Sequence, residues 1–199
     1  MDLKALIKGA IGRRRMPRLA LLVGVVAFGL NCSVPSRAAA AVDLFLNWPG
    51  ITGDAINAGF VGQIVLLSYS QTASNSASNP NTPPRGICGQ ITVTKHLDRS
   101  SPVLLGQVLS ETRTPGPVTI SFAKTGGAKT EGDFVFYKVA LHDVVPVSIT
   151  QSDSPSGDIV ETLVFMATRF QFSFIPQKPD GSQGAPVTFG FDCRLDRKI

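Results

Sequence analysis

Residues 91–127 hold the one convincing helix signal in a chain that otherwise reads as a succession of strands. Residues 91–97 alternate between apolar and polar in the period of a strand with one buried face. Asp98, Ser100 and Ser101 then offer side-chain oxygens to the first helical amides, and Pro102 suits the first helical position. The spacing predicts a helix over about 102–111, whose apolar face consists of Leu104, Leu105, Val108 and Leu109.

Strand alternation resumes soon after this helix. Thr114-Pro115-Gly116-Pro117 cannot continue a helix, and Val118, Ile120 and Phe122 alternate again. The stretch is therefore expected to form a strand, a helix docked on a sheet, and a second strand.

Residues 1–40 read as a secretory signal and are set apart from the fold. They contain a basic segment, an apolar run of twelve residues from Leu19 to Leu30, and a small-residue cleavage site before Ala41. Twelve apolar residues fall short of the ~20 that span a bilayer. Lipoprotein processing at Cys32 and export by the twin-arginine route are the alternatives. We expect cleavage near Ala40, export to the periplasm or medium, and no membrane span afterwards.

Removing this segment changes the charge of the protein. The whole chain carries a net charge of +5, but residues 1–40 contain seven of its nineteen lysines and arginines and one of its fourteen acidic residues. The mature part, residues 41–199, therefore has a net charge of about −1. Nothing in it favours binding to nucleic acid or to an anionic membrane. Its length suits a single domain.

The remaining alternating runs predict a mainly β domain of about eight or nine strands, which points to a closed or nearly closed β-barrel. Pro146 marks an edge or a bulge, and the polar run from Thr72 to Gly86 is expected to be an exposed loop. Phe170, Phe172 and Phe174 lie at strand spacing and are expected in the core. The further runs are 42–46, 63–71, 134–141, 144–150, 160–175 and 187–195.

Two cysteines remain after cleavage, Cys88 and Cys193. In an oxidising compartment such a pair suggests a disulfide. Cys88, however, shares its strand face with polar residues, whereas Cys193 shares its face with apolar ones. Two separate buried thiols are therefore the equally weighted alternative.

The sequence carries no familiar catalytic or metal-binding motif. His96 and His142 lie within or at the end of strands, and neither stands at a ligand spacing from a cysteine or carboxylate. His142-Asp143 has the composition of half a proton relay, but a surface histidine beside a turn carboxylate is the commoner arrangement. We expect no enzyme activity, no cofactor and no metal.

Several segments resemble the Hcp family, the hemolysin-coregulated proteins that form the tube of type VI secretion systems. The segment TKHLDRSSPVLLGQVLSET starting at Thr94 carries the resemblance most clearly. Four others follow in family order: DLFLNWPGITGDA at Asp43, QIVLLSYS at Gln63, FYKVALHDVVPVSIT at Phe136 and FQFSFIPQKPDGSQG at Phe170. The resemblance covers about residues 42–195 and implies a β-barrel that assembles into a hexameric ring, with secretion components or effectors as further partners.

One feature departs from the family. Hcp tube subunits resemble cytoplasmic proteins, which the type VI secretion system itself exports. Residues 1–40 of this chain instead read as a signal for a general export route. A stand-alone secreted Hcp-like protein, acting as a binding module or an effector, is therefore the alternative to a tube subunit.

Overall fold

The computed structural model describes residues 41–76, 83, 85–124, 134–153 and 157–199. These residues form eleven strands and one helix. Their bounds are β1 Val42–Asn47, β2 Ile64–Leu66, β3 Ser68–Asn75, β4 Gly86–His96, α1 Ser101–Leu109, β5 Val118–Lys124, β6 Phe134–His142, β7 Val145–Asp153, β8 Ile159–Met166, β9 Arg169–Phe174, β10 Val187–Asp192 and β11 Arg197–Lys198.

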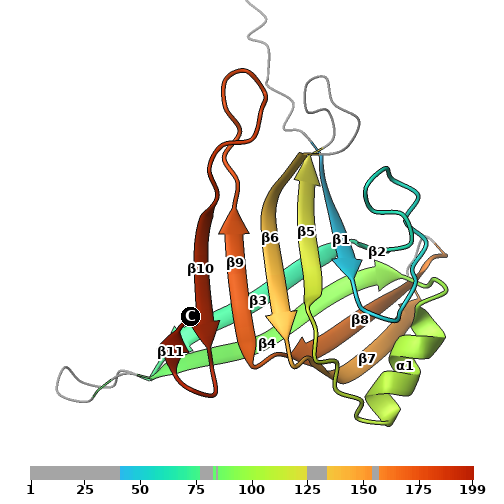
Figure 1. Cartoon of the computed structure of the whole chain (residues 1–199). Coiled ribbons are helices and arrows are strands. Elements are labelled where there is room, and N and C mark those ends of the chain that lie inside the picture. Colours follow the sequence, from blue (N-terminus) through green and yellow to red (C-terminus); the bar gives the residue numbers. More distant parts are fainter. Residues whose placement is uncertain (1–40, 77–82, 84, 125–133, 154–156) are drawn as a thin grey trace, which may run out of the picture. The chain divides into compact units, whose positions relative to one another are not determined.

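The strands form two antiparallel sheets (Figure 1). The large sheet has the order β11-β10-β9-β6-β5-β1-β2, and the small sheet has the order β3-β4-β8-β7. The predicted fold class, mainly β with one short helix, is confirmed. The hydrogen bonding shows two sheets rather than one closed barrel.

Two of the predicted alternating runs each divide between the sheets. Residues 63–71 form β2 in the large sheet and β3 in the small one, and the chain turns at Leu67, whose amide donates to the Thr94 carbonyl at 2.7 Å. Residues 160–175 divide into β8 and β9, and the Thr168 amide at this corner donates to the His142 carbonyl at 3.1 Å. Strands that pass from one sheet to the next at a bend are a known way to form corners.

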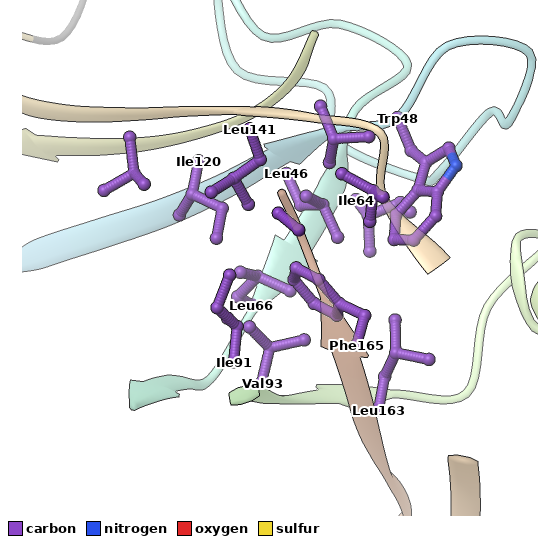
Figure 2. Packing of buried hydrophobic residues seen from close by; sticks show 14 of the residues in the cluster. Leu46, Trp48, Ile64, Leu66, Ile91, Val93, Ile120, Leu141, Leu163 and Phe165 are labelled. Carbon is purple, nitrogen blue, oxygen red and sulfur yellow. The ribbon is translucent and has the colours of Figure 1, made fainter. Parts of the chain in front are cut away.

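The two sheets share one apolar core (Figure 2). Leu46, Ile120 and Leu141 come from the large sheet, and Val93 and Phe165 come from the small sheet. The Trp48 ring meets Phe165 edge to face at a centroid distance of 5.5 Å. This shared core makes the two sheets one folding unit.

Helix α1 docks through fewer residues than its sequence indicated. Leu104 is fully buried and Val108 packs against the core, as expected. Leu105 and Leu109 are 39% and 78% exposed, so their predicted docking is wrong. The helix ends at Leu109, two residues earlier than predicted. Within the described residues no helix is long and apolar enough to cross a membrane.

Two other local expectations need revision. The run from Thr72 to Gly86 was expected to be loop throughout, but β3 continues to Asn75 and Gly86 begins β4. Residues 77–82 and 84 of this run lie outside the described residues. Phe170 is buried and Phe172 packs partly against the core, whereas Phe174 is 47% exposed.

Pro146 behaves as predicted. It lies in β7, which is an edge strand of the small sheet, and the register shifts between Pro146 and Ser148. An edge or a bulge is where a residue without an N–H is tolerated in a sheet.

Candidate functional site

The most concentrated polar chemistry in the described residues is a buried cluster at the N-terminus of α1. Lys95 on β4 and Glu161 on β8 are direct partners in the register of the small sheet, and neither side chain is exposed. Lys95 follows Ile91 and Val93 on the inward face of β4. An ammonium group is thus placed where the strand alternation calls for an apolar side chain.

Oxygen atoms surround the Lys95 ammonium. Its Nζ atom lies 2.6 Å from Glu161 Oε2, 2.8 Å from Asp98 Oδ1 and 2.9 Å from Ser101 Oγ. It also donates to the His96 carbonyl at 2.8 Å. Two carboxylates and two neutral acceptors therefore replace the water that Lys95 loses on burial, and a buried charge is tolerated only when it is paired in this way.

Three donors also satisfy the Glu161 carboxylate. Oε2 accepts from Lys95 and from Ser101 Oγ at 2.5 Å, and Oε1 accepts from Gln151 Nε2 at 2.7 Å. Burial by itself would raise the pKa of Glu161, but the hydrogen bonds from these three groups outweigh it. The pKa lies below its ordinary value. Glu161 is consequently held as a carboxylate.

The same cluster organises the turn into α1. Asp98 Oδ1 accepts from the Ser100 amide at 2.8 Å and from the Ser100 hydroxyl at 2.5 Å. Next to Asp98, Arg99 forms an ion pair with Asp54 in the loop before β2. Asp98 therefore satisfies the amide of Ser100, the N-cap residue, as the sequence indicated. The predicted capping by Ser100 is wrong, because its side chain makes no capping hydrogen bond.

This arrangement favours a structural role over catalysis. A lysine beside a serine hydroxyl can activate a nucleophile, but the Ser101 hydroxyl donates to Glu161, and two carboxylates engage Lys95. Lys95 and Glu161 are fully buried and Ser101 is 2% exposed, which leaves no room for a substrate. The cluster instead joins β4, β8 and the start of α1.

The two histidines do not form a site. His96 is the exposed last residue of β4, and His142 ends β6. The Asp143 carboxylate accepts from Thr168 Oγ1 at 2.8 Å and pairs with Arg169 at 3.5 Å. Within the described residues, Asp143 therefore does not act as a relay partner of His142, and no cluster of three or more potential metal ligands occurs there.

Cys88 and Cys193 are joined by a disulfide, with their Cα atoms 6.1 Å apart. This separation lies within the usual range for a bridge. Cys88 belongs to β4 in the small sheet, and Cys193 directly follows β10 in the large sheet. The bond therefore links the two sheets covalently at the end away from the Lys95 cluster along β4.

Sequence reasoning did not assign a role to Lys95 or Glu161. The available signal was the position of Lys95 in the alternation that includes Ile91 and Val93, since a lysine on an otherwise inward face needs a buried partner. Its partner is 66 residues away in the chain, so no local motif identifies Glu161.

These features define a class: a two-sheet β domain with one short helix, in which the buried charges position the helix. Within this class, a family model described as type VI secretion system effector, Hcp, matches residues 45–175, and the chain belongs to that family. The description of the family places the chain among type VI secretion system proteins.

Solved structures agree on the fold. A structure described as a type six secretion system protein has a TM-score of 0.72 at 19% identity, covering 80% of this chain and 100% of that chain. Hcp1 from Salmonella typhimurium gives 0.68 at 19% identity, with 80% and 99% covered. A type VI secretion system effector from Yersinia pestis gives 0.58 at 17% identity, with 75% and 99% covered. A comparison with curated proteins found no match.

Proposed function

We propose that the protein is an exported Hcp-family subunit that assembles into a closed ring, most simply a hexamer, without catalytic activity of its own. The observation that carries the proposal is the family match over residues 45–175, together with a fold shared along nearly the full length of the related structures. The buried Lys95 cluster agrees with a non-catalytic role because its charged groups pair with one another inside the domain and are not exposed to a substrate.

Surface features of the domain are compatible with assembly. A closed ring needs one face of each subunit to meet a different face of the next. Ile56 and Val61, in the loop before β2, are 89% and 75% exposed, and Leu109 projects from α1. These exposed apolar side chains are candidates for contacts that become buried between subunits.

The oligomeric state tests the ring. Sedimentation velocity on the purified, oxidised protein should show one assembly several times the monomer mass at micromolar concentration. A protein that stays monomeric well above micromolar concentration would rule out the ring.

Export is the second part of the proposal. The predicted signal, residues 1–40, lies outside the described residues, so the support comes from its sequence and from the disulfide, a bond typical of oxidising compartments. N-terminal sequencing of periplasmic and extracellular fractions should find a new terminus near Ala41. An intact Met1, or protein confined to the cytosol, would contradict export.

A stand-alone secreted protein is the second candidate, and the disulfide favours it because tube assembly by the family starts in the reducing cytosol. If the exported protein is a monomer, it is the stand-alone secreted protein. If the exported protein forms a ring, it is a subunit that assembles outside the cytosol.

A further inference from the structure

A cavity of about 180 Å³ lies where β3 and β4 of the small sheet meet β9 and β10 of the large sheet. In Figure 1 these strands cross beside β11. Ten residues line the cavity, and none of them carries a charge. It is separate from the Lys95 cluster, and its lining is almost entirely apolar.

One wall of the cavity is an array of four phenylalanine rings. Phe189 pairs with Phe172, and Phe191 pairs with Phe170, so all four side chains lie on one face of β9 and β10. Neighbouring rings are nearly parallel, with interplanar angles of 13° to 20° and centroids 6.1 to 6.5 Å apart. Phe189 is 47% exposed, which places it at the mouth.

The opposite wall comes from β3 and β4 and includes two of the smallest residues, Ala73 and Gly86, beside the larger Gln71 and Ile87. At Gly86 the small sheet approaches as closely as it can, because a Cβ atom there would lie 2.6 Å from Phe191 Cζ. Ala73, paired with Cys88 in the register of β3 and β4, lines the cavity with a single methyl group. The Cys88–Cys193 disulfide fixes the spacing of the two walls. A space therefore remains between Ala73 and the rings.

The geometry points to a binding site for a small neutral molecule built on a single aromatic ring. An enclosed apolar cavity of roughly 150 Å³ suffices for benzene. The volume here is similar, but the site is partly open to solvent, so it suits one ring with a small substituent directed toward the mouth. The phenylalanine array offers faces and edges for stacking. The ten lining residues carry no charge, and at the mouth the Lys198 ammonium lies over the Phe189 ring, 5.9 Å from its centroid. A cationic ligand would therefore lose its hydration without compensation and would also be repelled by Lys198.

Toluene is the probe, measured by calorimetry and by saturation-transfer NMR on the purified, oxidised protein. We expect binding of one toluene per chain. Benzylammonium has a similar ring with a positive charge and should bind at least ~10-fold more weakly. Absence of toluene binding up to its solubility limit, or equal binding of benzylammonium, would overturn the proposal.

Two substitutions locate the site. Ala73→Leu fills the gap and should weaken toluene binding at least ~10-fold. Ser70→Leu is the matched control, because Ser70 lies on the same strand, is exposed and does not line the cavity, and it should change binding less than ~2-fold. Phe189→Ala removes an exposed ring from the wall and should weaken binding even if Ala73→Leu does not fold. Unchanged binding in folded Ala73→Leu or Phe189→Ala protein would place toluene elsewhere and refute the site.

Discussion

Lys95 Nζ lies 2.6 Å from Glu161 Oε2, and neither side chain has any exposed surface. Breaking a buried pair from one side leaves an uncompensated charge, which is far more costly than removing both partners. The stability of the domain should therefore depend strongly on the presence of a lysine at position 95.

Replacing Lys95 with methionine should destabilise the domain by about 3–5 kcal/mol, because the Glu161 carboxylate remains buried without its cation. Urea unfolding followed by circular dichroism measures the effect. Lys138→Met is the matched control, since Lys138 is an exposed residue of β6 and should change stability by less than ~0.5 kcal/mol. Equal effects of the two substitutions would contradict a structural role for the Lys95 cluster.

The same cluster predicts sensitivity to acid. The pKa of Glu161 is lowered from its ordinary value of 4.5 in the folded protein, so the unfolded chain binds a proton more readily. The stability that Glu161 contributes is thus present above pH ~4.5 and is lost as the pH falls through the lower folded pKa. Unfolding free energies measured between pH 7 and pH 3 should fall less steeply for Glu161→Gln than for the wild type. Parallel curves would show that Glu161 is not a source of the acid sensitivity.

The single tryptophan provides a second test of the core. Trp48 Nε1 donates to Thr114 Oγ1 at 2.9 Å in a buried hydrogen bond. Thr114→Val removes the acceptor and leaves the indole N–H unsatisfied, which should cost about 1–3 kcal/mol. Tryptophan fluorescence during urea unfolding reports this loss directly. Thr188→Val, at an exposed position of β10, should leave the midpoint nearly unchanged, and a matching loss there would argue against the hydrogen bond.

The disulfide should contribute strongly to stability because it spans 105 residues. In the chain-entropy model, a loop of this length stabilises by about 4–5 kcal/mol. The double substitution of Cys88→Ser with Cys193→Ser should therefore lower the thermal midpoint substantially, as should a reducing agent on the wild type. Peptide mass mapping without reduction checks the bond itself. Recovery of both cysteines as alkylated thiols would show that it does not form.

How far the sequence predicted this fold depends on whether each signal was local. The start of α1, which lies between Asp98 and Pro102, was found because capping is decided within a few residues. The corner at Leu67 was missed because apolar and polar residues alternate through it without a break, and only the amide bond to Thr94 shows the change of sheet. Glu161 was missed for a related reason, since its partner lies on another strand.

The exposure of Leu105 and Leu109 shows a different limit. Both lie on the apolar side of the helical pattern, but α1 contacts the core mainly through Leu104 and Val108. Amphipathic spacing indicates which side of a helix is apolar, and the neighbouring elements decide how much of that side is covered. The cavity beneath the phenylalanine array could not be predicted at all, because it depends on how closely two separate sheets approach.

The place of β1 inside the large sheet bears on when the protein can fold. This first strand lies between β2 and β5, and Leu46 pairs with Ile120 on a strand that is made only after β4 and α1. Sheets dominated by pairings between distant residues fold slowly, on a scale of ~milliseconds to seconds. A newly synthesised chain with this topology therefore stays unfolded for longer. Slow folding of this kind is compatible with the export that we propose, because an export channel of the general route accepts an unfolded chain.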